Sequence, residues 1–200
     1  GNIYILLIGL GAFVGILGMA FNKMLTVSLD AFKQAPLPAV LKPMLPLLLA
    51  LILGFLLPQA LGGGSKLVDS LVVSNYTWYF LLILLLGKFF FTMICFGSGV
   101  PGGIFLPMLV LGSLGGAIFA KLAVLAGIME PQWTVNCIVF GMTAYFSAVV
   151  KSPVTGAILI MEMTGSCEHL LALIIVSMTA YLLADILNGL MALPNLIALF

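Results

Sequence analysis

Charged residues are scarce in this sequence. Of its 200 residues, 6% are charged and 64% are hydrophobic, and the formal net charge is +1. A soluble domain has about 25% charged residues. This chain therefore lacks the polar side chains that a water-covered surface requires, and we expect lipid to cover most of it.

Patterns typical of soluble function and of catalysis are also missing. The basic residues are seven scattered lysines, with no arginine and no basic patch for nucleic acid. Cys95, Cys137 and Cys167 lie in or beside apolar runs without metal-ligand spacing, so we interpret them as packing residues. No HExxH motif, GxSxG motif or pair of intramembrane aspartates occurs. We predict no enzyme activity, no cofactor and no nucleic-acid partner.

Long apolar runs recur along the chain instead. A bilayer core about 30 Å thick needs about 20 apolar residues in a helix, and no charged residue lies between Lys88 and Lys121. These runs predict an all-α, polytopic membrane protein. We expect helices at residues 3–32, 43–61, 66–74, 77–96, 108–127, 134–149, 153–163 and 170–187, and the start of another element at 196–200.

Glycine and proline interrupt the apolar runs at two places. Residues 62–65 read Gly-Gly-Gly-Ser, and residues 97–107 hold four glycines and two prolines. Non-helical backbone at membrane depth is tolerated only where protein buries it or where it lines an aqueous cavity. Such interruptions favour a transporter built from broken, tilted helices over a bundle of straight spans.

The break at residues 97–107 predicts an anion site made of main-chain amides. A helix that begins inside the membrane directs free N–H groups at whatever precedes it, and its dipole places about half a positive charge there. Glycine lets the backbone approach a ligand, and Pro107 suits a first helical turn. Partial charges also bind an anion weakly enough to release it. The alternative is that these glycines only allow helices to pack closely.

Four segments resemble, in the same order, motifs of the CLC family of chloride channels and chloride–proton antiporters. Residues 97–107 contain Gly-Gly-Ile-Phe-Leu-Pro, similar to the family's G-G-I-F-x-P. Residues 141–144 and 151–156 are similar to its G-M-x-A and [RK]-x-P-[LV]-T-G pair. Residues 162–165 contain Glu-Met-Thr, as in the family's E-M-T segment.

The resemblance implies a fold and a function. The chain, residues 1–200, is expected to be the C-terminal half of a CLC-type membrane domain, one of two inverted repeats. The implied activity is transport of chloride or a similar anion, by passive conduction or by exchange with protons. The implied anion-binding residues are Gly103, Ile104, Phe105, Leu106 and Pro107, with the Ile104 and Phe105 amides on the central anion. The resemblance also implies a homodimer in membrane lipid, in which residues 153–187 of the two subunits are in contact. The expected location is a bacterial inner membrane.

Several alternatives stay open. The gating and internal glutamates of the family are not in this chain, so channel and exchanger are not distinguished. No tyrosine follows Tyr181 to take the place of the family's central tyrosine, and fluoride-selective relatives exist. Ser98 is not assigned as an anion ligand, because that serine belongs to the first repeat. A further alternative is a non-conducting fragment that serves assembly or dimerisation only.

The charged residues within apolar sequence are interpreted structurally. Lys151 is eleven residues from Glu162, across a loop and a helix start, and could pair with it, so we favour a structural role for Glu162 over proton handling. We expect Asp185 to mark a helix end. Lys88 and Lys121 bound the longest uncharged stretch, and we expect both side chains to extend to the membrane interface.

Overall fold

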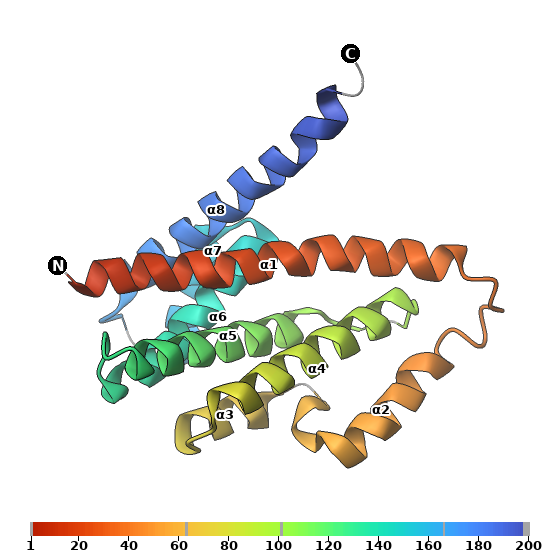
Figure 1. Ribbon diagram of the computed structural model, residues 1–200, viewed down its shortest axis with the longest axis horizontal. Helices are drawn as coiled ribbons and strands as arrows, with labels where there is room; N and C mark the ends of the chain where they lie inside the picture. Colours follow the sequence, from red (N-terminus) through yellow and green to blue (C-terminus); the bar gives the residue numbers. More distant parts are fainter. Residues whose placement is uncertain (1, 63, 101, 166, 198–200) are drawn as a thin grey trace.

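The computed structural model describes residues 2–62, 64–100, 102–165 and 167–197. Over these ranges the chain forms eight α-helices and two short 3-10 helices (Figure 1). The α-helices are α1 (Asn2–Gln34), α2 (Met44–Leu56), α3 (Ser65–Val73), α4 (Trp78–Gly97), α5 (Phe105–Leu125), α6 (Thr134–Val150), α7 (Pro153–Thr164) and α8 (Leu170–Ile197). The 3-10 helices are η1 (Pro58–Ala60) and η2 (Pro131–Trp133).

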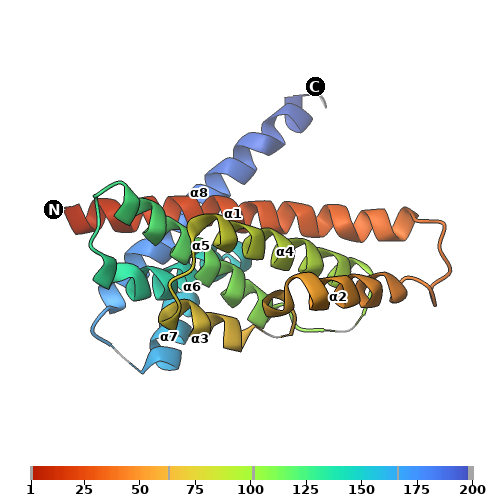
Figure 2. The same ribbon diagram turned by 60° about the horizontal axis from the view of Figure 1, so that its bottom comes forward.

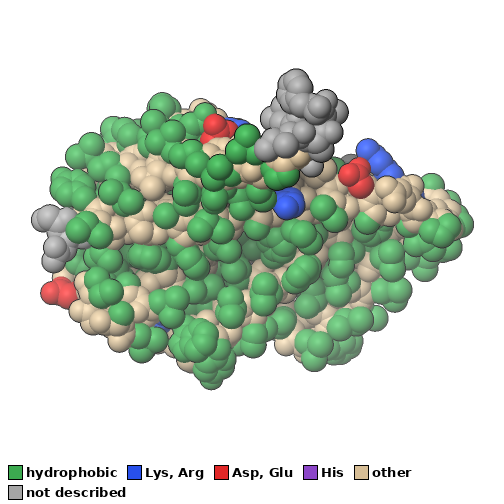
Figure 3. Space-filling view, turned by 45° about the horizontal axis from the view of Figure 1, so that its top comes forward, with side chains coloured by type: hydrophobic (Ala, Val, Ile, Leu, Met, Phe, Trp, Pro, Cys, Tyr) green, Lys and Arg blue, Asp and Glu red, His purple; other side chains and the backbone are tan. Residues whose placement is uncertain are grey.

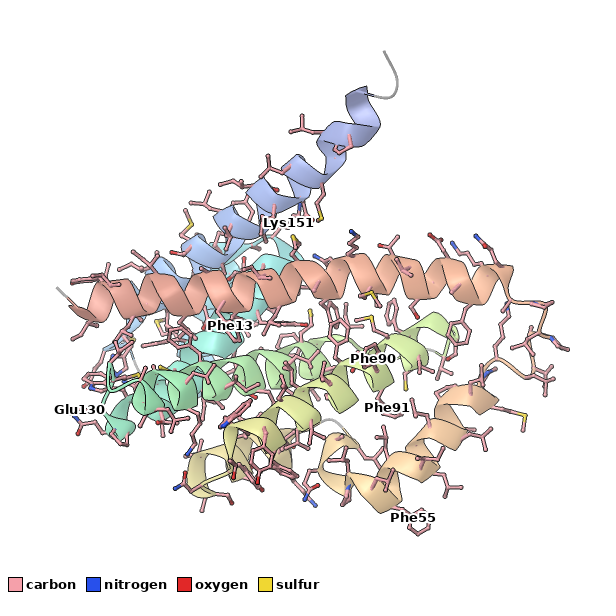
Figure 4. The ribbon with its side chains drawn as sticks, viewed as in Figure 1. Phe13, Phe55, Phe90, Phe91, Glu130 and Lys151 are labelled. Atoms are coloured by element: carbon pink, nitrogen blue, oxygen red, sulfur yellow. The ribbon has the colours of Figure 1, made fainter. Side chains whose placement is uncertain are left out.

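Five helices in the described part of the chain are long and apolar enough to cross a membrane: α1, α4, α5, α6 with η2, and α8. The helices α2 and α7 are apolar but shorter. One face of the molecule is covered mostly by hydrophobic side chains with scattered charged groups (Figure 3). Phe55 on α2, which is 83% exposed, points away from the body (Figure 4). The prediction of an all-α, polytopic membrane protein is confirmed.

The span predicted at residues 43–61 is wrong. Helix α2 ends at Leu56 after 13 residues, and the chain turns at Leu57 into the 3-10 helix η1. Pro58 explains the stop, because it has no N–H group and its ring clashes with the carbonyl one turn earlier. The short helix places the chain's glycine-rich break beside α4, which α2 and η1 both contact.

The predicted end of the last span at residue 187 is also wrong. Helix α8 continues to Ile197, through Asn188 and Gly189 and with Pro194 inside it. Asp185 therefore lies within a helix and does not mark its end. The separate element expected at 196–200 is not found: residues 196 and 197 belong to α8, and 198–200 lie outside the described residues. The far end of α8 projects from the body (Figures 1 and 2).

The buried core centres on α5 and α6, the most buried of the spanning helices. Their backbones approach closely, because glycines face each other across the contact. A Cβ atom at Gly112 would lie 2.7 Å from the carbonyl oxygen of Gly141. Helix α1 packs against this pair and against α4 and α8. Figure 1 shows α1 running the length of the molecule, and α5 contacts both α4 and α6. Such contacts between small residues are a common way to pack helices in membranes.

Candidate anion site

The interruption between α4 and α5 is a genuine break in helical structure. After α4 ends at Gly97, the N–H of Ser98 donates to the carbonyl of Ile94 (3.0 Å) and the N–H of Gly99 donates to that of Phe96 (3.2 Å). Gly99 has φ 79°, a left-handed conformation that favours glycine. Gly102 and Gly103 follow in non-helical conformation, and Pro101 lies outside the described residues. The chain thus reverses inside apolar sequence before α5 begins.

Helix α5 begins at Phe105, three residues earlier than expected. Ile104 is its N-cap, and the N–H of Met108 donates to the carbonyl of Ile104 (3.0 Å). Pro107 in the first turn allows this early start, because a residue there needs no intrahelical hydrogen bond. No side chain caps the helix. The N–H groups of Phe105 and Leu106 therefore lack both an intrahelical acceptor and a capping side chain.

A cavity of about 160 Å³ lies in front of this helix end. Its wall contains backbone from the break and side chains from α4. The lining residues are Gly62, Lys88, Phe91, Thr92, Cys95, Phe96, Val100, Gly102, Gly103, Ile104 and Pro107. A Cβ atom built at Gly102 or Gly103 would meet no atom within 4 Å, so the space beside these glycines is open. Phe90 and Phe91 project from α4 in Figure 4, and Phe91 lines the cavity.

The five predicted anion-binding residues divide into two groups. Gly103, Ile104 and Pro107 line the cavity. Phe105 and Leu106, which are 36% and 47% exposed, are not among the residues that line it. The Phe105 ring instead packs edge-on against Phe146 of α6, with ring centroids 5.9 Å apart. This contact packs the start of α5 against the core.

Ser98 has a local structural role. Its side chain is buried, and its hydroxyl donates to the carbonyl of Cys95 at 2.8 Å, at the end of α4. The serine does not line the cavity that contains Gly103. The hydroxyl thus satisfies a terminal carbonyl of the helix.

The expectation that Lys88 extends to the membrane interface is wrong. Its side chain is 2% exposed, and its Nζ donates to the carbonyl of Ala60 (3.2 Å) and to the carbonyl of Gly62 (2.6 Å). These carbonyls lie at the end of η1 and in the glycine-rich break, where no continuing helix supplies donors. Sequence reasoning missed Lys88 as a residue of the cavity. The available signal was a lysine in the middle of an apolar run that follows a glycine-rich break.

The pairing suggested between Lys151 and Glu162 is also wrong. Lys151 ends α6 in a left-handed conformation (φ 58°), and its Nζ lies 3.1 Å from Oδ1 of Asp185 on α8. Both side chains are about half exposed, and Figure 4 shows Lys151 near α8. Glu162 is exposed on α7. Helix α8 packs against both α6 and α7, and this packing places Asp185 beside the α6–α7 junction.

Apolar helices that cross a membrane, with a break whose uncapped helix end opens on a cavity, define an integral membrane protein of the broken-helix, multi-pass class. The chain belongs to the voltage-gated chloride channel family, whose family model matches residues 1–185. The resemblance seen in the sequence motifs is thereby confirmed.

Similar proteins are bacterial exchangers. The chain is 38% identical over 187 residues to "H(+)/Cl(-) exchange transporter ClcA" of Vibrio campbellii, a match that covers 90% of this chain and 39% of that protein. It is 35% identical over 187 residues to the protein of the same name from Salmonella agona. The chain therefore spans about two fifths of the length of these curated relatives.

Solved structures share the fold. A slow cyanobacterial Cl−/H+ antiporter matches with a TM-score of 0.78 and 33% identity, over 93% of this chain and 44% of that one. A CLC-type fluoride/proton antiporter matches with a TM-score of 0.77 and 21% identity, over 92% of this chain and 44% of that one. At that identity the second likeness shows the fold alone. The predicted fold class is confirmed.

Proposed function

We propose that this chain is one half of a membrane domain that transports chloride or a similar small anion, and that the amide end of α5 holds the anion. The uncapped start of α5, which opens on the cavity beside Gly102 and Gly103, carries this proposal. The relatives that bear the name H(+)/Cl(-) exchange transporter support the anion and add protons as coupled substrate.

The chemistry of the site suits a transported anion. Two N–H groups, on Phe105 and Leu106, are free at the start of the helix, and the helix dipole adds partial positive charge. Open space beside Gly103 lets an anion approach Ile104, which lines the cavity, and the start of α5 that follows it. Amides bind through partial charges, so the anion is held but can leave.

The remaining expectations belong to the same proposal. The order of the motifs at residues 97–107 and 151–156 supports the C-terminal repeat of a CLC-type domain as the identity of residues 1–200. Exposed apolar side chains on α7 and α8, such as Ile158 and Leu171, suit cover by lipid or by a second copy in a homodimer. A bacterial inner membrane is the proposed location, because the similar exchangers are bacterial proteins.

Replacement of Phe105 tests the amide site. Phe105→Pro removes one N–H group at the first helical position. Because proline also disfavours the αR backbone of Ile104 before it (φ −91°, ψ −8°), thermal unfolding of the same variant is measured as the fold control. Phe105→Ala removes the same ring and keeps the N–H group. A hydrogen bond to a charged group contributes about 1.5–3 kcal/mol, so we expect Phe105→Pro to weaken anion binding by a further tenfold to hundredfold, roughly, relative to Phe105→Ala.

The measurement is anion efflux from liposomes that contain the whole protein carrying this chain, at a series of chloride concentrations. Equal chloride dependence in the two variants would remove the amide of Phe105 from the site. The alternative function is that of a non-conducting fragment that serves assembly or dimerisation only. One observation favours it: the chain covers 39% of the length of the similar exchanger from Vibrio campbellii. Liposomes containing only the 200-residue chain test it, and we expect no efflux from them.

A further inference from the structure

Lys88 is buried in a way that a packing role alone does not account for. It lies within α4, an uncharged apolar span apart from this one residue, and only 2% of it is exposed. A buried charge is expensive unless it is paired. Within the described ranges, the ion pair that the structure forms is between Lys151 and Asp185, and the acceptors of Lys88 are main-chain carbonyls. The charge of Lys88 is thus held in place by hydrogen bonds and is not cancelled by a carboxylate.

The position of Lys88 is as informative as its burial. The residue lines the cavity in front of α5, together with Gly103 and Ile104. An ammonium group has three donors, and the carbonyls of Ala60 and Gly62 accept two of them. These carbonyls fix the charge against one wall of the cavity, while Ile104 and Pro107 at the start of α5 form another part of its wall.

We propose that the Lys88 ammonium is a positioned positive charge of the anion site, which sets how strongly the cavity retains a small monovalent anion. This inference rests on the proposed function, since it assigns Lys88 to the same site as the α5 amides. The amides orient the anion by hydrogen bonds at short range. Lys88 adds a longer-range attraction, which the dipoles of the two carbonyls partly offset. That arrangement favours occupancy by an anion without forming a permanent ion pair.

The expected size of the effect follows from the dimensions of the cavity. A volume of about 160 Å³ corresponds to a space roughly 7 Å across. A unit charge that acts over that distance at an effective dielectric constant of about 20 changes anion affinity by roughly fiftyfold. The carbonyl dipoles reduce this, and we expect removal of the charge to weaken apparent chloride affinity by about tenfold.

Three substitutions of Lys88 separate the effect of its positive charge from a purely structural role (a brace), in which its Nζ only holds the carbonyls of Ala60 and Gly62 by hydrogen bonds. Lys88→Gln keeps an N–H donor for the carbonyls but loses the charge, Lys88→Met loses both, and Lys88→Arg keeps both. Lys121→Gln is the matched control, because it also removes a lysine charge. Lys121 lies on α5, its Nζ donates to Oδ1 of Asn75, and it does not line this cavity. The readouts are the chloride concentration for half-maximal efflux, the maximal efflux and the chloride-dependent rise in thermal unfolding temperature, all in the whole protein that carries this chain.

If Lys88 attracts the anion, Lys88→Gln and Lys88→Met both raise the half-maximal chloride concentration about tenfold, Lys88→Arg recovers most of the affinity, and Lys121→Gln does not change it. If Lys88 is only a brace, Lys88→Met lowers the unfolding temperature and maximal efflux while chloride dependence stays as in the unmodified protein, and the inference is overturned. Absence of chloride-dependent efflux and of chloride-dependent stabilisation in the unmodified protein would refute the proposed function itself. If the unmodified protein shows chloride-dependent efflux and stabilisation, and Lys88→Gln has the same half-maximal chloride concentration, the role of Lys88 is refuted and the proposed function is not.

Discussion

Gly103 allows a test that separates the anion site from the stability of the fold. Gly103→Ala adds one methyl group at the wall of the cavity, where the new Cβ would meet no atom within 4 Å. The backbone of Gly103 is not in the left-handed region, so an L-residue fits it. The protein therefore accommodates the methyl without a clash, and the methyl occupies cavity space next to Ile104, on the approach to the amide end of α5.

The magnitude follows from what the methyl displaces. It takes up roughly the volume of one water molecule, about 30 Å³, in a cavity of about 160 Å³. An anion that is pushed away from one amide loses a charge-assisted hydrogen bond of about 1.5–3 kcal/mol. We expect chloride affinity to fall by roughly tenfold to a hundredfold. The free energy of unfolding should stay the same or rise slightly, because alanine restricts the unfolded chain more than glycine does.

The assay combines chloride-dependent efflux with thermal unfolding of the same detergent-purified samples. Gly189→Ala on α8 is the matched control, since its Cβ also meets no atom within 4 Å and Gly189 lies outside the cavity. We expect this control to retain chloride affinity and to be at least as stable as the unmodified protein. Unchanged chloride affinity in Gly103→Ala would refute the placement of the anion at the amide end of α5.

Two further predictions concern the core that holds the site. Gly116→Ala should destabilise the protein by about 1–3 kcal/mol in an unfolding titration, because the new Cβ would overlap the carbonyl of Cys137 on α6; a stability equal to that of Gly189→Ala would show that α5 and α6 are less closely packed. Tyr145→Phe should raise the unfolding free energy by about 1–3 kcal/mol, because the buried Tyr145 hydroxyl has no hydrogen-bond partner among the described residues. A loss of stability in Tyr145→Phe would instead indicate that the hydroxyl is hydrogen-bonded in the assembled protein.

Local sequence predicted most of the helices for a simple physical reason. A run of apolar residues must satisfy its own backbone hydrogen bonds in lipid, and only a helix does so within one segment. The break at residues 97–107 was equally readable, since glycine and proline act on the backbone at their own positions. The helix lengths were less readable. Pro58 shortened α2, whereas Pro194 did not end α8, and the two prolines differ in what surrounds them more than in their own chemistry.

The partners of charged side chains were not readable from sequence. Lys151 could reach several acidic residues by sequence distance, and its partner became Asp185 because α8 packs against both α6 and α7. Lys88 looked like an interfacial residue, because it bounds a long uncharged stretch. Its true neighbours, the carbonyls of Ala60 and Gly62, lie 26 to 28 residues earlier in the chain.

The sequence by itself determined the class of protein and the position of the helix break, because hydropathy and the conformational limits of glycine and proline are local properties. Tertiary structure alone decided that a cavity opens at that break and that Lys88 lines it, because both depend on how α4, the glycine-rich segment and α5 come together. Long-range packing sets which dipoles and charges share one low-dielectric space. That arrangement, more than any single motif, governs how strongly the site would hold an anion.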